Sequence, residues 1–377
     1  MFGKRWTLFE LFGFKVQIDA SWLVLALLVT WSLATGVFPQ YYPGLPSATY
    51  WSMGILGMIG LVFSIVFHEA SHSLVARAHG MQIKGITLFI FGGVAELGEE
   101  PETARTEFLV AIAGPISSFL LALSFFLLAW VLDNLGVATS LQGVGYYLAS
   151  INALLATFNL LPAFPLDGGR ILRAGLWYWK GDLLWATRIA ARSGEILGYA
   201  LIGLGVLSIV GGNFVGGLWW SLIGLFVRQA AGASYLQLMA REALAGAPIR
   251  RFMTSDPITV PPSVTLRAFV DDYVYRYHFD LYPVTRGGHL IGSVLARDVK
   301  AIAPDDWGAH FVSEIMRPST PELTIAHDSD ALQALAQMRS TGNSRLLVTD
   351  ADRLIGVIVL KDMLDFIALR MDLENSD

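Results

Sequence analysis

Apolar and polar residues are distributed unevenly along this chain of 377 residues. Up to about Val227 the sequence is a series of apolar runs, whereas from about Pro248 it has the charge density and the alternation of a soluble domain. Each run has roughly the twenty residues that a helix needs to cross a bilayer. Six spans are predicted, at residues 20–37, 51–76, 108–132, 143–161, 194–210 and 217–227, the last extending to about 238. The last two runs also suit a shorter hairpin. No cleavable signal peptide is expected, because no convincing small-residue cleavage site follows the first run.

Basic residues occur in every second connection between these runs. Residues 38–50, 133–142 and 211–216 contain no Lys or Arg, whereas the opposite set of connections contains them repeatedly. Cytoplasmic connections carry an excess of Lys and Arg. The asymmetry therefore predicts a multi-pass protein of the cell membrane with both termini, and the soluble C-terminal region, in the cytoplasm.

Composition narrows the chemistry further. The net charge of −5 gives no nucleic-acid signature, so no nucleic-acid partner is expected. The chain has no cysteine, which excludes disulfides and thiolate ligands, so any metal must be bound through nitrogen and oxygen. The predicted fold class is a multi-span α-helical membrane protein with a C-terminal soluble α/β module. Residues 1–238 are assigned to the membrane domain, 239–247 to a linker and 248–377 to the soluble module.

The second predicted span contains three ionisable residues in the sequence FHEASH. His68 and His72 are four residues apart, so a helix places both imidazoles on one face, where they can meet one metal ion. Glu69 lies about 100° around the same helix, within reach of a water molecule at that metal. Ionisable side chains are costly in hydrocarbon. A zinc-hydrolase site is therefore favoured over a structural pair of core histidines.

A catalytic zinc usually takes three protein ligands, and candidates of two kinds compete for the third place. One is Asp167, after the fourth predicted span, and the other is an acidic residue of the first cytoplasmic connection, one of Glu96, Glu99 and Glu100. Asp167 and His72 are both a few residues before a cytoplasmic arginine, so their depths match. Pro162 and Pro165 end the helix before Asp167, and the glycine pair after it permits a tight turn. We therefore favour Asp167.

Residues 86–97 (ITLFIFGGVAEL) are mostly apolar, β-branched or aromatic and contain Gly92 and Gly93. This pattern suits an extended hairpin or a re-entrant loop that offers a strand edge to an unwound substrate. Gly92 and Gly93 are accordingly candidate substrate-binding residues. A loop at the membrane interface that only packs against the helices is the alternative.

The order of these motifs resembles the site-2 protease family of intramembrane metalloproteases. The resemblance covers roughly residues 14–238 and depends on HEASH, on FGGVAEL after it, on AGPISS at residues 113–118 and on PLDGGR after the fourth span. It implies a core of three helices that holds one Zn²⁺ in a cavity reached by water from the cytoplasm. It also implies cleavage of transmembrane segments of other membrane proteins, for which a single-span substrate is expected.

Site residues follow from the same resemblance. It implies that His68, His72 and Asp167 bind the zinc and that Glu69 is the general base. Asn159, eight residues before Asp167, is implied as a polar contact that holds the tetrahedral intermediate or the substrate backbone.

The soluble region contains an internal repeat. Met253 corresponds to Met316, Gly292 to Gly356 and Asp298 to Asp362, at offsets of 63, 64 and 64 residues. The two copies, residues 248–303 and 312–370, resemble tandem CBS motifs. Such pairs often bind adenine nucleotides and regulate an attached domain, which makes Asp298 and Asp362 candidate nucleotide-binding residues.

The repeat departs from the nucleotide-binding pattern at one position in each copy. Leu295 and Val359 stand three residues before the two aspartates, where nucleotide-binding members commonly have Ser or Thr. A homodimerisation or docking module without ligand is therefore an open alternative.

The predicted function is a zinc-dependent intramembrane endopeptidase regulated by its CBS pair. The alternative, from another class, is a metal transporter or metal-gated channel with a CBS regulatory tail, because transporters also place His and Asp at membrane depth. Glu69 distinguishes the two, since a transporter needs no base beside its first ligand.

Overall fold

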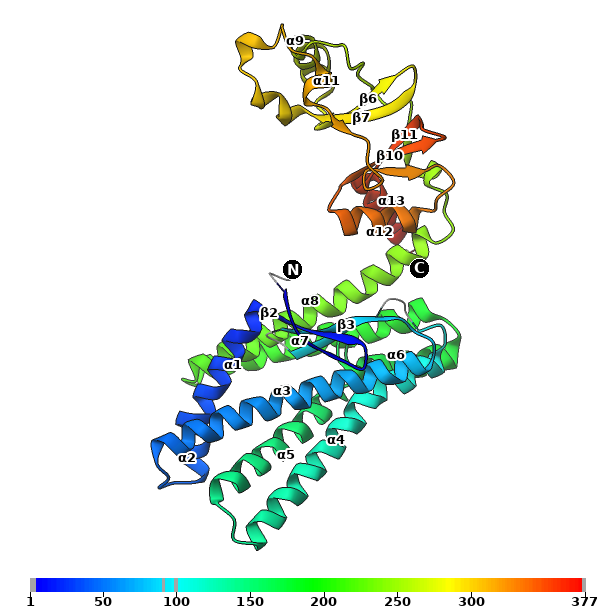
Figure 1. Cartoon of the computed structure of the whole chain (residues 1–377). Coiled ribbons are helices and arrows are strands. Elements are labelled where there is room, and N and C mark those ends of the chain that lie inside the picture. Colours follow the sequence, from blue (N-terminus) through cyan, green and yellow to red (C-terminus); the bar gives the residue numbers. More distant parts are fainter. Residues whose placement is uncertain (1–4, 90–91, 98–100, 375–377) are drawn as a thin grey trace. The chain divides into compact units, whose positions relative to one another are not determined.

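The structure is a computed structural model that describes residues 5–89, 92–97 and 101–374 (Figure 1). The chain forms two compact units, and the boundary between them in the sequence falls between Leu236 and Gln237. The first unit is mainly helical, and the second contains a mixed α/β module. The predicted fold class is confirmed.

Five helices in the described part of the chain are long and apolar enough to cross a membrane. They are Ala20–Tyr41, which comprises α1 (Ala20–Ser32), a π-helical turn (Leu33–Val37) and α2 (Phe38–Tyr41), then α3 (Ser47–Ala78), α4 (Ala104–Asn134), α7 (Leu183–Val210) and α8 (Phe214–Leu244). The fourth predicted span forms α5 (Thr139–Asn159), which has 21 residues but is less apolar. One reason is Asn152, which is fully buried and donates to Ser64 Oγ on α3 at 2.8 Å.

Helices α3, α4 and α5 lie side by side in the first unit (Figure 1). Glycines on α3 permit this close packing. A Cβ atom on Gly60 would lie 2.5 Å from Leu148 of α5, and one on Gly57 would lie 3.2 Å from Tyr147 of α5. Small residues bring helix backbones together where lipid gives no hydrophobic driving force.

A four-stranded sheet packs against α1 and α3, in the order β1 (Arg5–Leu11), β2 (Phe14–Asp19), β3 (Ile83–Phe89), β4 (Gly92–Leu97). β3 and β4 pair antiparallel, which confirms the predicted hairpin. β2 joins β3 in parallel through the register Val16 to Ile86. Both of these side chains are fully buried in a core shared with α1 and α3. The sequence analysis did not predict β1 and β2.

Asp167 begins a separate amphipathic helix, α6 (Asp167–Lys180). The two residues after it lie in the first helical turn and do not form the tight turn that the sequence suggested, so that expectation was wrong. Their lack of a Cβ serves packing instead. A Cβ on Gly168 would lie 2.3 Å from the carbonyl oxygen of Leu160, and one on Gly169 would lie 2.4 Å from the backbone of Ala163.

The second unit contains two copies of one motif. Its main strands are β5 (Met253–Ser255), β6 (Leu281–Arg286), β7 (His289–Leu295), β8 (Arg317–Pro318), β9 (Thr324–Ala326), β10 (Arg345–Asp350) and β11 (Arg353–Val359). β10 and β11 follow β6 and β7 at an interval of 64 residues, as the sequence offsets predict. The first strand of each copy pairs with the last strand of the other, because β5 pairs with β11 and β8 with β7.

Each copy has its own apolar core. Leu266, Phe269 and Tyr282 are fully buried in the first core, beside the irregular helix that comprises α9 (Leu266–Ala268), a π-helical segment (Phe269–Val274) and α10 (Tyr275–Tyr277). The second core lies between β10, β11, α12 (Ala331–Thr341) and α13 (Leu360–Glu374). Residues 239–247, predicted as a linker, are helical up to Leu244. Ala240 and Leu244 are buried in that second core.

Candidate metal centre

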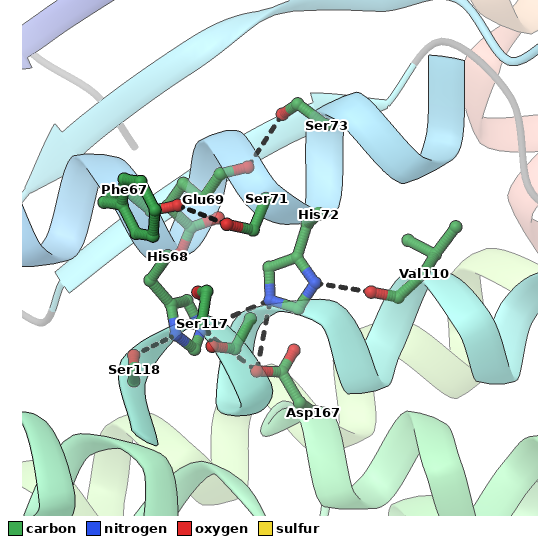
Figure 2. A network of polar contacts seen from close by, with 11 residues as sticks. Phe67, His68, Glu69, Ser71, His72, Ser73, Val110, Ser117, Ser118 and Asp167 are labelled. Atoms are coloured by element: carbon green, nitrogen blue, oxygen red, sulfur yellow. Dashed lines mark hydrogen bonds and ion pairs between the residues drawn. The ribbon is translucent and has the colours of Figure 1, made fainter. Parts of the chain in front are cut away.

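Three side chains from two helices converge at one point in the first unit. His68 and His72 of α3 direct their imidazoles toward the carboxylate of Asp167 at the start of α6 (Figure 2). The His68 Nε2 and His72 Nε2 atoms lie 3.1 and 3.2 Å from Asp167 Oδ2, and 3.2 Å from each other. All three residues are at least nine-tenths buried. Among the described residues they are the one group of three with metal-ligand spacing.

The hydrogen bond at His72 Nδ1 determines what the other ring nitrogen, Nε2, can bind. His72 Nδ1 lies 2.6 Å from the carbonyl oxygen of Val110. A carbonyl oxygen only accepts, so Nδ1 carries the proton and the neutral ring presents a lone pair at Nε2. That lone pair faces the lone pairs of the Asp167 carboxylate. Two acceptors 3.2 Å apart require a proton or a cation between them, and a metal ion satisfies all three ligand atoms together.

The spacing fits zinc. Zinc binds imidazole nitrogen and carboxylate oxygen at about 2.0–2.1 Å, so the edge of a tetrahedral site is about 3.3 Å. The three observed edges of 3.1–3.2 Å agree with this value. Three protein ligands leave one corner of a tetrahedron for water or substrate, which is the arrangement of a catalytic zinc site.

Helix α4 fixes the orientation of both histidines. Besides the contact of His72 with Val110, His68 Nδ1 lies 2.9 Å from Ser118 Oγ (Figure 2). Between these two positions the site leaves no room for a side chain. A Cβ on Gly114 would lie 2.2 Å from His72 Nε2 and 2.6 Å from His68 Nε2. Such contacts on the outer ring nitrogen set the tautomer and direction of a metal-binding histidine.

The sequence analysis assigned no role in the site to Val110 and Ser118. Ser118 is the last residue of the AGPISS motif. The small and hydroxylated residues of this motif were a sequence signal for close packing and hydrogen bonding next to the helix that carries the histidines. The contribution of Val110 is a backbone carbonyl, so its residue type carries no signal.

A cavity of about 300 Å³ adjoins the centre. His68, Glu69 and Asn159 line it, together with Gly92 and Gly93 of β4. The structure thus brings together the predicted base, the predicted polar contact and the predicted substrate-binding glycines. A Cβ on Gly93 would lie 2.7 Å from Glu69 Cγ, so the hairpin backbone passes directly over the base. The roles of these residues remain predictions.

The structure does not describe the side chains of the three competing third ligands. Glu99 and Glu100 lie outside the described residues. Glu96 belongs to β4, and its side chain is likewise not described. Asp167 fills the third position in the geometry above.

The CBS pair presents its two candidate aspartates differently. Asp298 is bound by Arg317, whose Nη2 lies 3.0 Å from Asp298 Oδ1. Asp362 is exposed and lines a cavity of about 480 Å³, together with Thr254, Arg345 and several apolar side chains.

Comparison with known proteins shows which families the two units resemble. The sequence profile of Peptidase family M50 matches residues 56–145 and 131–201. Rip3 of Mycobacterium tuberculosis, which carries a provisional zinc-metalloprotease name, is 36% identical over 353 residues, or 93% of this chain and 90% of Rip3. The chain belongs to peptidase family M50. The profile of the CBS domain matches residues 249–304 and 312–369.

Two further proteins are similar to this M50 peptidase. Zinc metalloprotease MJ0392 of Methanocaldococcus jannaschii is 30% identical over 81% of this chain and 82% of its own length. A solved site-2 protease from the same organism is similar over 61% of this chain and 94% of that chain, with a TM-score of 0.44 and 30% identity. The chain is a membrane protein and a zinc metalloprotease of the site-2 type with a CBS pair. The metal-transporter alternative is not favoured.

Proposed function

We propose that this M50 peptidase hydrolyses peptide bonds within transmembrane segments of other membrane proteins. The observation that carries the proposal is the cavity lined by His68 and Glu69, on a helix of membrane-spanning length, and by Gly92 and Gly93 of β4. The most direct substrate is a single-span membrane protein, since one unwound segment fills a cavity of this size.

Different residues of the chain carry out the separate steps of the reaction. His68, His72 and Asp167 would hold the zinc ion, which when bound polarises water and the scissile carbonyl. Glu69 takes the proton of the attacking water and returns it to the leaving amine. The Asn159 side chain, in the same cavity, donates a hydrogen bond to the developing oxyanion.

The hairpin supplies a binding edge for the substrate. A membrane helix satisfies its backbone hydrogen bonds internally, so the scissile segment must unwind before attack. β4 is the last strand of its sheet, and an extended segment can pair with its outer edge. Gly93 lies against Glu69, so a segment paired there is held beside the base.

Replacing the base separates catalysis from metal binding. The Glu69→Gln variant keeps the size of the side chain but cannot accept the proton. We expect loss of cleavage of a co-expressed membrane substrate, with one zinc ion per chain retained by elemental analysis. Ser71→Ala is the matched control, because the Ser71 hydroxyl donates to the Phe67 carbonyl oxygen within α3 and its side chain lines a different cavity from that of Glu69. Continued processing by Glu69→Gln would contradict the protease mechanism.

We further propose that the CBS pair binds an adenine nucleotide at the Asp362 cavity and regulates the peptidase. Asp362 is exposed beside an open cavity, whereas Asp298 is paired with Arg317. Titration of the full-length protein with ATP, ADP and AMP should show one site per chain. Asp362→Ala should remove binding and Asp298→Ala should leave it. Absence of thermal stabilisation at millimolar concentrations of all three nucleotides would leave a docking or homodimerisation module, which cross-linking of the full chain tests.

The basic-residue asymmetry supports a cytoplasmic position for both termini and the CBS pair. The absence of native cysteine makes a test simple. Single cysteines at Ser47→Cys and Ser319→Cys should react differently with an impermeant maleimide in intact cells. Only the first should be labelled, and the reverse pattern would invert the topology.

A further inference from the structure

A buried ion pair connects the two helices that complete the metal centre. Glu107 in the first turn of α4 is fully buried, and Arg173 of α6 is 7% exposed. Arg173 Nε donates to Glu107 Oε1 at 2.6 Å, and Arg173 Nη2 donates to the same oxygen. The guanidinium also lies 5.2 Å from the ring centre of Phe164. Glu107 Oε2 is buried without a hydrogen-bond partner in the described structure.

Both partners lie within two turns of groups that act on the metal centre. Glu107 is one helical turn before Val110, whose carbonyl holds His72 Nδ1. Arg173 is less than two turns after Asp167, the ligand at the start of α6. The pair therefore joins the helix that orients the histidines to the helix that carries the third ligand.

Stability alone is a weak reason for such a pair. The cost of removing two charges from water commonly offsets their attraction, and apolar residues of similar volume often stabilise as well or better. Here one carboxylate oxygen lacks a partner, which adds to the cost. What a pair with two N–H donors on one oxygen does provide is a fixed register between two helices.

We propose that Glu107 and Arg173 are positioning residues for the metal centre. Their ion pair fixes α6 against α4, so that Asp167 Oδ2 stays within 3.2 Å of both imidazole nitrogens. Neither residue belongs to the metal-ligand group or lines the cavity beside it. Their effect on zinc binding passes through Asp167 on one side and through Val110 and His72 on the other.

The test removes the pair without leaving a lone buried charge. In the double variant Glu107→Leu with Arg173→Met, both charges are replaced by apolar side chains of similar volume, which the fold tolerates. The zinc Kd of the metal-free full-length protein is measured by competition with a chelator. We expect Kd to rise about 10- to 100-fold, as for other residues that support metal ligands. The visible absorption spectrum of the cobalt-substituted protein should change as well, because it reports ligand geometry.

A matched control removes another polar contact between helices. Arg188 Nε of α7 donates to the Tyr235 hydroxyl of α8 at 3.0 Å, and neither helix carries one of the three metal-ligand residues. Arg188→Leu should leave the zinc Kd and the cobalt spectrum unchanged. If the double variant is folded and keeps both properties, or if the control loses zinc equally, the proposal is wrong.

A conservative variant covers the case in which the double variant does not fold. Arg173→Lys keeps the charge but loses the two-donor contact with Glu107. We expect a zinc Kd raised by about threefold or more at unchanged helix content, and an unchanged Kd would overturn the proposal.

Discussion

The metal centre and the CBS cavity place their acidic groups in opposite surroundings. Asp167 is buried, and its oxygen already lies within 3.2 Å of both histidine nitrogens, which are themselves held by α4. Asp362 is exposed beside an open cavity of about 480 Å³. Neighbouring helices fix the geometry of the metal centre. In the CBS pair, the side chain next to each aspartate decides whether that aspartate is exposed or paired.

That dependence is visible within the CBS pair itself. Arg317, which binds Asp298, corresponds to Thr254 by the same offset that relates Met316 to Met253. The strand registers agree, since Arg317 pairs with Ser293, and Thr254 with the equivalent residue of the other copy. The difference between Arg317 and Thr254 thus leaves Asp298 paired with an arginine and Asp362 exposed beside a cavity.

The largest expected effect is at the metal centre. A Cβ at Gly114→Ala would lie 2.2 Å from His72 Nε2, so the ring must move out of register with Asp167. We expect zinc affinity to fall by about 100-fold or more, measured by elemental analysis and chelator competition. Gly175→Ala on α6 is the control, because nothing lies within 4 Å of the added carbon. Full zinc content in Gly114→Ala would show that the geometry of the metal centre is not fixed by the contact between α4 and the histidines.

An intermediate effect is expected from making the two CBS copies alike. Thr254→Arg places a guanidinium beside Asp362, as Arg317 is placed beside Asp298. We expect adenine nucleotide affinity of the full-length protein to fall at least tenfold by calorimetry, about 1.4 kcal/mol. The reverse change, Arg317→Thr, should open a second site. If Thr254→Arg and the native chain bind nucleotide equally well, the residue at position 254 does not control nucleotide binding at the Asp362 cavity.

The smallest effect concerns an exposed acid. The hydrogen bond of Glu314 with His310, supported by the Phe311 backbone N–H, holds the pKa of Glu314 below its ordinary value of 4.5. The folded-state pKa is the lower one, so its stabilisation is present above 4.5 and is lost as pH falls through the folded pKa. Glu314→Gln should therefore lower the melting temperature of the full chain slightly at about pH 6, with no difference near pH 2. A difference that persists in acid would assign the effect to something other than the carboxylate.

Much of this arrangement could be predicted from the sequence. Helical spacing places His68 and His72 on one face, and the position of Asp167 before a basic segment matches their depth. The constant offset between Gly292 and Gly356 predicts two copies of one strand pair, and β7 and β11 confirm it.

Other features had weaker signals or none. Alternation at Phe14, Val16 and Ile18 after the Gly13 turn was a strand signal, but it lies beside an apolar span that dominates the local pattern. The contact of Val110 with His72 involves a backbone carbonyl, which any residue provides. The glycines after Asp167 suggest a turn equally well as close packing, and only the carbonyl oxygen of Leu160 beside Gly168 decides between them.

The exchange of strands between the two CBS copies has a consequence for synthesis of the protein. β5 is made early in the module, but its partner is β11, so that Met253 pairs with Ile358 roughly a hundred residues later. Such distant pairings form slowly because the intervening chain must close as a loop. The first copy therefore leaves the ribosome with β5 still unpaired, and the sheet is complete only after β11 has been translated.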